Sequence, residues 1–398
     1  MKNQRKQFEP VVSQERNEQI DFFRGFLLVL MTINHFISGN NFLIRITREA
    51  IGWVEGAAGF VFLSGFTVGL IYTNKYLKKG EYYIRRTAFN RSWLIYKFHI
   101  SAFILSLLAV LSLEVIKNHW GLYYSTMLEH PFVASILATG FLYQPKNLDI
   151  LPMYALFLLP VPWIITYLHK NIKGHFLVLG ISFLVYLIGT FQQIQLNYTW
   201  LSWGRWIDTG AFDILSWQFL FVMGLFLGYK SFKHELAFIF DRPPVLYSAL
   251  ILAGCLCILR NAISLHLIES TDFDIHFWAD KKYLRPLRGI NIAVIFILIR
   301  YLMVKFKDWF RYKPLIYLGK NSIEVFFFHL LLVLFLSPFN SCLNHLSSFH
   351  LFKQYYFFPL ETLLTFAVVA ALFLAPILWS KSSLYYQDVK SFFYKPVN

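Results

Sequence analysis

Two polar side chains within one apolar run, Arg24 and His35, have types and a spacing that could support chemistry. They are eleven positions apart, so at about 100° per residue they are rotated by roughly three turns plus 20° and share a helix face. Their separation along the helix axis is roughly 16 Å. This face therefore offers a permanent cation near one end and, near the other, an imidazole that can exchange a proton near neutral pH.

Both residues also have a structural interpretation. Arg24 lies about one turn inside the run, so its side chain could be an anchor that extends to the membrane interface. Asp21, three residues earlier, could pair with Arg24 as a purely structural link. His35 could be a hydrogen-bonded interior histidine, but its place beside Asn34 near the end of the run favours proton transfer.

Other polar groups inside apolar runs are functional candidates as well, because burying them in a membrane is costly. Glu55 or Glu324 could orient the imidazole of His35 and stabilise its charged form. Solvation near the end of a span also accounts for Glu55. Asn321 lies three residues before Glu324 and shares its stripe of the helix, which makes it a candidate substrate ligand. We interpret His329, five residues after Glu324, as a packed histidine.

The strongest basic cluster lies in the segment 75–91 and contains Arg85, Arg86 and Arg91. Guanidinium groups bind phosphates through paired hydrogen bonds, so this cluster could bind a nucleotide-bearing thioester such as an acyl-coenzyme A. The excess of positive charge in the cytoplasmic loops of membrane proteins is the alternative explanation.

The segment 193–210 holds closely spaced tryptophans together with Trp203, Arg205 and Asp208. Aromatic rings at the ends of spans usually form an interfacial belt. They could also stack on the apolar faces of sugar rings while the flanking polar groups bind hydroxyls. The second interpretation makes Trp203, Arg205 and Asp208 candidate glycan ligands.

The composition excludes an ordinary soluble domain, because 57% of the residues are hydrophobic and only 15% are charged, against about 25% in a typical soluble protein. The positive-inside rule accounts for the net charge of +15 without a nucleic acid partner. The three cysteines suggest neither a disulfide framework nor a metal site, and we expect no tightly bound cofactor.

These properties predict an all-α fold, a polytopic membrane helix bundle of about ten transmembrane helices. The expected spans are residues 20–38, 52–73, 92–115, 149–168, 175–192, 211–229, 243–260, 286–304, 314–337 and 357–379. Lys and Arg concentrate in alternate connecting segments, with 4 in residues 1–19, 6 in 74–91 and 5 in 300–313. The N- and C-termini are therefore expected to be cytoplasmic.

We expect one transmembrane domain over residues 20–379, between cytoplasmic tails at 1–19 and 380–398. The segment 1–19 has no apolar stretch of its own, so the first run is expected to be a retained span rather than a cleaved signal peptide. The apolar stretch Pro131–Tyr143 is too short to span and is expected to be re-entrant or interfacial.

Six blocks, in this order, resemble the OpgC family of bacterial inner-membrane proteins, which belongs with the acyltransferase-3 group. The likeness covers about residues 15–340, and the blocks are IDFFRGFLLVLMTINH, EGAAGFVFLSGFTVGLIY, RRTAFNR, NLDILPMYALFLLPVP, FDILSWQFLFVMGLFLG and LGKNSIEVFFFHLLLV. In the wider group, an Arg or Lys and a His separated by ten residues form a signature on the first span, which here corresponds to Arg24 and His35. A second signature, two arginines separated by two residues, is not met literally by Arg85, Arg86 and Arg91.

The resemblance implies a multi-pass enzyme of the bacterial inner membrane that transfers acyl groups. Its donor would be a cytosolic acyl-CoA, in this family succinyl-CoA, and its acceptor the hydroxyls of a periplasmic glucan. A transporter or flippase of a polar or lipid-linked glycan is the alternative, and it predicts broken helices in two matching halves. The acyl group, the glycan and the oligomeric state stay open.

Overall fold

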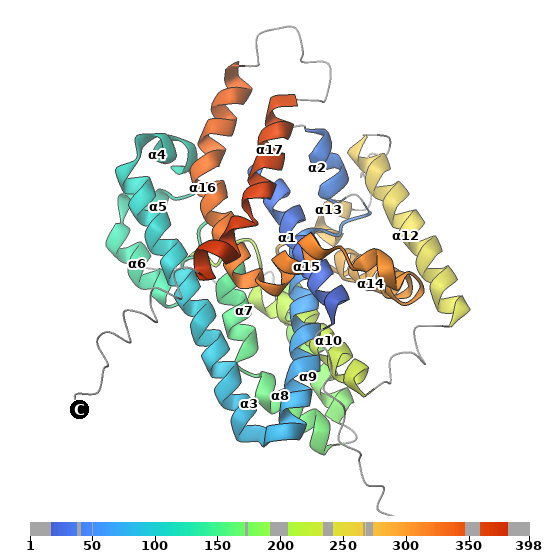
Figure 1. Cartoon of the computed structure of the whole chain (residues 1–398). Coiled ribbons are helices and arrows are strands. Elements are labelled where there is room, and N and C mark those ends of the chain that lie inside the picture. The colour runs from blue at the N-terminus through green and yellow to red at the C-terminus, as the bar shows by residue number, and fades with distance from the viewer. Residues whose placement is uncertain are drawn as a thin grey trace, which may run out of the picture.

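The computed structural model describes residues 17–37, 41–49, 51–171, 174–191, 206–233, 242–265, 267, 274–346 and 359–380. Within these residues the protein is a bundle of helices without β-strands, as predicted, and Tyr143 and Asp208 form one isolated bridge. Figure 1 shows that α16, α17 and the two halves of α3 run along the bundle, whereas α14 and α15 lie across it near its middle.

The first half of the chain forms α1 (Glu18–Phe36), α2 (Phe42–Thr47), α3 (Gly56–Ser112), α4 (Glu114–Trp120), α5 (Ser125–Glu129), α6 (Pro131–Thr139), α7 (Ile150–Leu158), α8 (Val161–Lys170) and α9 (Gly174–Phe191). The second half forms α10 (Ile214–Phe232), α12 (Pro243–Ser264), α13 (Ile275–Trp278), α14 (Pro286–Lys305), the 3₁₀-helix η3 (Lys307–Phe310), α15 (Lys313–Lys320), α16 (Ser322–Leu346) and α17 (Pro359–Ala371).

The start of α1 follows from its sequence. The side chain of Asn17 accepts hydrogen bonds from the backbone N–H groups of Gln19 and Ile20, at 3.0 and 3.3 Å, which satisfies two donors that the first helical turn leaves free. Glu18 and Asp21 lie in the first turn and His35 in the last, so the acidic residues complement the positive end of the helix dipole. This cap fixes the start of the helix that carries Arg24 and His35.

α3 contains two of the expected spans, because the helix turns back at Gly80 (Figure 1). Gly80 has φ of 78°, a conformation that residues with a Cβ rarely adopt. No other atom lies within 4 Å of the place where a Cβ would be. The backbone angle, rather than crowding, therefore requires glycine here, and the bend separates the expected spans 52–73 and 92–115.

The first half of α3 crosses α10 at very short range because small residues meet on both helices. A Cβ added to Gly65 or Gly69 would lie 2.1 Å from a backbone oxygen of α10. A Cβ added to Gly224 or Gly228 of α10 would lie 2.2 or 2.1 Å from one of α3. Each helix therefore carries two glycines four residues apart, the spacing that allows membrane helices to approach closely.

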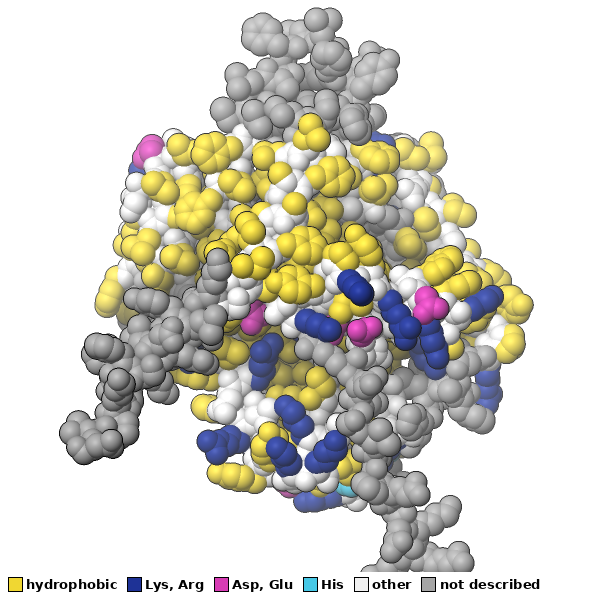
Figure 2. Space-filling model, viewed as in Figure 1, with side chains coloured by type: hydrophobic (Ala, Val, Ile, Leu, Met, Phe, Trp, Pro, Cys, Tyr) yellow, Lys and Arg dark blue, Asp and Glu magenta, His cyan; other side chains and the backbone are white. Residues whose placement is uncertain are grey.

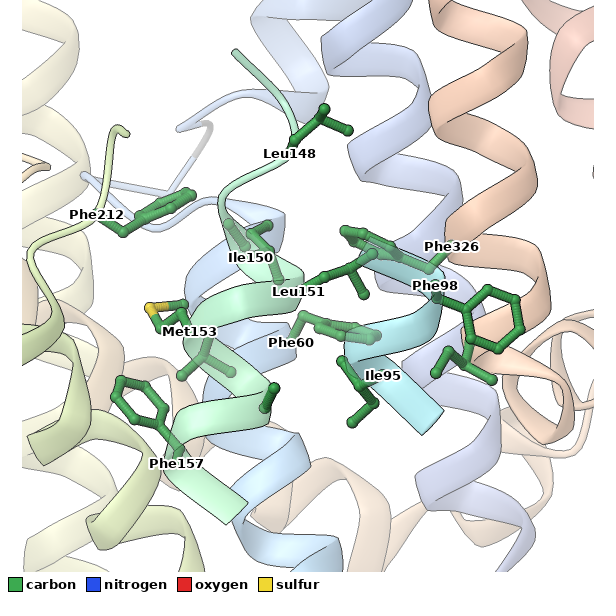
Figure 3. Packing of buried hydrophobic residues seen from close by; sticks show 14 of the residues in the cluster. Phe60, Ile95, Phe98, Leu148, Ile150, Leu151, Met153, Phe157, Phe212 and Phe326 are labelled. Carbon is green, nitrogen blue, oxygen red and sulfur yellow. The ribbon is translucent and has the colours of Figure 1, made fainter. Parts of the chain in front are cut away.

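The main apolar core lies between both halves of α3, α7 and α16. Figure 3 shows Phe60, Ile95 and Phe326 close together beside Leu151 of α7. The rings of Phe60 and Phe326 stack with centroids 5.8 Å apart. This core holds α16 against α3 at the level where α16 also meets α1.

Seven described helices are long and apolar enough to cross a membrane, and the pair α7 and α8, bent by 40°, would make an eighth. The protein is therefore a multi-pass membrane protein. A total of ten requires that α1, which carries three charged residues, and the two halves of α3 each count as spans, so that number stays a prediction. α6, within the stretch expected to be too short to span, has nine residues.

One surface shows how charge is distributed. In Figure 2, Lys and Arg side chains gather on the lower part of the visible face, below a broad apolar surface. The lower end of Figure 1 is where α3 bends at Gly80. The membrane side that this end faces, and hence the side of the two termini, stays a prediction.

α12 and α14 pack on each other and are fastened to the rest of the bundle by Glu49, Arg260 and Arg288, which we call the Glu49 cluster. The Glu49 carboxylate is 2.6 Å from the guanidinium of Arg288 and 3.1 Å from that of Arg260. Burial raises the pKa of Glu49, but the charges and hydrogen bonds of Arg288 and Arg260 outweigh it and hold this pKa below its ordinary value of 4.5. The cluster therefore contains an ionised carboxylate between two cations.

Candidate active site

Arg24 and His35 both contact α16. Nη2 of Arg24 donates a hydrogen bond to Oγ of Ser322, and Nδ1 of His35 lies 3.3 Å from Nε2 of His329. The two imidazole rings are nearly parallel, with centroids 5.5 Å apart. Ser322 and His329 are seven residues, about two turns, apart. The shared face of α1 thus faces protein, and α1 and α16 run in the same direction.

The hydrogen-bond partners of His329 fix its tautomer. Its Nδ1 lies 2.5 Å from the carbonyl oxygen of Phe326, and a carbonyl oxygen can only accept, so Nδ1 carries the proton. In neutral His329 the lone pair is then on Nε2, which faces His35. His329 is fully buried, a setting that disfavours a charged ring.

The same reasoning extends to His35. Because Nε2 of His329 accepts, Nδ1 of His35 must donate, and in neutral His35 the unprotonated nitrogen is then Nε2. His35 is only half-buried. The two histidines therefore form a chain from the Phe326 carbonyl to His35, which leaves Nε2 of His35 as the unprotonated ring nitrogen.

Three cations act electrostatically on His35, namely Arg48, Lys146 and Lys281. Arg48 donates to the backbone oxygen of the neighbouring Asn34 at 2.7 Å. Lys146 lies over the ring of Tyr123, 3.6 Å from its centroid. These cations come from three segments far apart in the sequence, and together they make the surroundings of the imidazole positive.

The two carboxylates expected beside His35 have different positions. Glu55 forms an ion pair with Lys281 at 3.0 Å, so it is linked to His35 through that lysine. Glu324 lies in the first turn of α16, five residues before His329. The side chain at hydrogen-bond distance from the imidazole is His329, and the catalytic roles of both glutamates stay predictions.

The side chain of Asn321 lies at the junction of α15 and α16. Its Nδ2 donates to the backbone oxygen of Tyr317 at 2.9 Å, which satisfies a carbonyl in the last turn of α15. This contact gives Asn321 a structural role at the end of α15. The role of Asn321 in substrate binding stays a prediction.

The three arginines expected to bind the donor lie on α3 beyond the bend at Gly80. Arg85 pairs with Glu81 and lies over the ring of Trp163, 5.2 Å from its centroid. Arg86 is exposed, whereas Arg91 is half-buried and acts electrostatically on the buried Tyr72. The three guanidinium groups therefore have different surroundings, and their binding of a donor stays a prediction.

Of the glycan ligands expected in 193–210, Trp203 and Arg205 lie outside the described residues. Asp208 is part of a short bridge to the loop before α7, where its backbone N–H donates to Leu142 and its backbone oxygen accepts from Gln144. Its carboxylate accepts from the N–H of Gly210 at 2.9 Å. The loop that carries Asp208 is thus fastened to the bundle.

Sequence reasoning interpreted His329 as a packed histidine and did not connect it with His35. The spacing of Ser322 and His329 could have indicated a connection. Seven residues are about 20° short of two full turns, so the two side chains share a helix face. This spacing matches the shared face of Arg24 and His35. Only the packing of α1 on α16 shows that the two faces meet.

Comparison with known families adds to this geometry. The family model described as OpgC protein matches residues 16–382. No curated protein matches the chain. Membership of this family supports a transferase function of the glucan-modifying, acyltransferase-like kind, and a base held by two helices suits such a reaction. The chain, a multi-pass membrane protein with a paired-histidine site, belongs to the OpgC family.

Proposed function

We propose that this protein is an O-acyltransferase of the bacterial inner membrane that transfers an acyl group from a cytosolic acyl-CoA to hydroxyls of a periplasmic glucan. The observation that carries the proposal is the contact between His35 and His329, because it leaves Nε2 of His35 as the unprotonated nitrogen of a half-buried imidazole. Family membership supports the same class of reaction.

In the proposed reaction the glucan hydroxyl gives its proton to Nε2 of His35 while its oxygen attacks the thioester carbonyl. A C–O bond forms, the C–S bond breaks, and the proton passes from the imidazolium to the leaving thiolate. General base catalysis of this kind contributes roughly 10² to 10⁴ in rate. Arg24, held by Ser322 on the same face of α1, would bind a polar group of the donor.

The surroundings of His35 favour an acyl group that itself carries a negative charge. Arg48, Lys146 and Lys281 all act on the imidazole. Lys281 is paired with Glu55, so Arg48 and Lys146 are the cations that would attract the free carboxylate of a succinyl group. An acetyl group carries no charge that could pair with these cations. We therefore propose succinyl-CoA as the donor. Trp203, Arg205, Asp208 and Asn321 are the proposed glucan ligands.

The test uses membrane vesicles that contain the full chain. Succinyl-CoA labelled in the acyl group is supplied on the cytoplasmic side of the vesicle membrane, and a purified glucan is supplied on the other side. We expect label to appear on the glucan as an ester that mild alkali releases. Acetyl-CoA in the same assay tests the choice of acyl group. A glycan transporter would move the glucan without labelling it, and that result would refute the proposal.

A further inference from the structure

A cavity of about 1080 Å³ lies between α1, the first half of α3 and α14. Its walls are apolar along most of its length, with Leu27 and Leu30 from α1, Phe62 from α3, and Ile295 and Ile299 from α14. α12 and α14 form one side of the molecule, and the cavity separates them from the body of the bundle. We call this cavity the α14 groove.

One end of the α14 groove is basic. Arg300, Lys307, Arg311 and Lys320 line it next to the start of α1, where Glu18 also reaches it. Nε2 of Gln19 donates to the backbone oxygens of Met303 and Lys307 at 3.0 and 3.4 Å, which closes α14 against α1 here. Arg311 is also paired with Asp308 at 3.1 Å, so four cations face two carboxylates here. This excess of positive charge suits an anionic group such as a phosphate.

The other end of the groove reaches the surroundings of His35. Thr47 and Glu55 line it. Oγ1 of Thr47 donates to the side chain of Asn34 at 2.8 Å, and Glu55 pairs with Lys281, which acts on His35. A ligand that extends along the groove from the basic end would therefore have its far end beside Glu55, whose partner Lys281 acts electrostatically on His35.

The dimensions of the groove fit an extended arm. Ile20 and Leu30 both line it, and ten residues of helix span about 15 Å. The pantetheine arm of coenzyme A has a backbone equivalent to four or five extended residues, or roughly 15 Å. The apolar carbons of the arm suit the apolar walls between the two polar ends of the groove.

Resting on the proposed function, we infer that the α14 groove is the donor site for an acyl thioester of coenzyme A. The phosphates bind Arg300, Lys307, Arg311 and Lys320, the arm lies along α1 and α14, and the thioester carbonyl lies at the Glu55 end. This assignment places the donor phosphates on α14, η3 and α15 rather than on Arg85, Arg86 and Arg91.

Binding of a non-reactive thioether analogue of succinyl-CoA to the purified full chain tests the basic end. Lys307→Gln and Arg311→Gln should each raise the Kd of the analogue about five- to tenfold, the loss expected for one charge-assisted contact. Lys305→Gln is the matched control, since Lys305 lies two residues before Lys307 and contacts Tyr301 instead. Its Kd should stay within about twofold of the parent.

A bulky side chain tests the apolar part. Ile299→Trp should fill the groove and weaken analogue binding by about tenfold or more. Leu302→Trp is the control, because Leu302 is on the same helix, is 39% exposed and does not line the groove. Melting temperatures in detergent show whether each variant is folded.

Failure of the parent to bind the analogue would overturn the inference. So would folded groove variants that bind the analogue as tightly as the parent. The same holds if Arg86→Gln loses binding while the groove variants keep it. Variants that lose bound phospholipid but keep analogue binding would identify a lipid site and overturn it as well. Groove-dependent binding without label on any glucan would instead support the groove and refute the proposed function.

Discussion

At the scale of residues, a second imidazole lies at hydrogen-bond distance from the imidazole proposed as the base, in a place that a carboxylate occupies in many enzymes. The bond from His329 Nδ1 to the Phe326 carbonyl makes Nε2 of His329 an acceptor, and this fixes the tautomer of His35. A neutral partner orients the base without adding negative charge beside it. The surroundings stay positive through Arg48, Lys146 and Lys281.

Replacement of the proposed base gives the first prediction. His35→Ala should lower acyl transfer by at least about two orders of magnitude, because proton removal from the hydroxyl would depend on solvent. His276→Ala, which removes an exposed histidine at the start of α13, is the control and should retain the rate of the parent. Transfer by His35→Ala within a few fold of the parent would rule out this assignment.

His329 is predicted to be a positioning residue, and its variants separate that role from simple packing. His329→Ala should lower kcat roughly tenfold or more with little change in the donor KM, because His35 loses the group that fixes its tautomer. His329→Gln, whose amide oxygen can accept from His35, should recover part of kcat. His329→Leu keeps a similar side-chain volume but cannot accept a hydrogen bond, so it should not recover kcat. Recovery of kcat by His329→Leu would show that only packing matters.

At the scale of elements, the glycines of α3 and α10 decide how closely these helices pack. Gly65 and Gly69 meet the backbone of α10, and Gly224 and Gly228 meet that of α3. Inside a membrane the hydrophobic effect does not drive helices together, because lipid tails are as apolar as the side chains. Close backbone contact instead allows many van der Waals contacts to add up. The α3–α10 pair is therefore a rigid support for the first half of α3, which lines the α14 groove.

Substitution at this crossing gives the third prediction. Gly228→Val should destabilise the protein by about 2 kcal/mol or more, because its Cβ would meet a backbone oxygen that cannot move without separating the helices. Gly254→Val on α12 is the control, since nothing lies within 4 Å of its added Cβ. Thermal unfolding in detergent measures both, and equal melting temperatures would contradict the packing argument.

At the scale of the whole molecule, α12 and α14 are attached to the bundle at two places with the α14 groove between them. At one place Gln19 donates to the backbone oxygens of Met303 and Lys307. At the other, the Glu49 cluster holds Arg288, which also donates to the backbone oxygen of Trp53 at 2.7 Å. These attachments connect α14 to α1 and to the segment before α3, on either side of the groove.

The Glu49 cluster predicts a pH dependence of stability. Its two cations lower the pKa of Glu49, so the stabilisation is fully present above the ordinary value of 4.5 and is lost as pH falls through the lower folded-state pKa. Glu49→Gln should remove this acid-dependent component and cost about 1.5–3 kcal/mol at neutral pH.

Melting temperatures measured from pH 7 to pH 3 test this, with Glu114→Gln as the control because Glu114 is 71% exposed in its pair with Lys117. The control should follow the pH dependence of the parent. If the curves of Glu49→Gln and the parent were parallel down to pH 3, Glu49 would not be the titrating group.

Much of this protein follows from its sequence alone. Apolar runs of about 20 residues cannot leave their backbone groups unpaired in lipid, so they form helices whatever their neighbours are. The spacing of Arg24 and His35 places them on one face for the same reason, because helical geometry is local. The glycine at position 80, between two apolar runs, lies where the chain turns back.

The tertiary structure alone decided which faces meet. The sequence indicated that His35 needs a partner and proposed a carboxylate, but nothing local distinguishes His329 from Glu324 when both lie on α16. The α14 groove is lined by residues of α1, α2, α3, α10, α14, η3 and α15, which are separated by up to about 300 positions of sequence. Packing between membrane helices depends on close fits of small residues and a few hydrogen bonds, which are properties of pairs of surfaces and not of either sequence segment by itself.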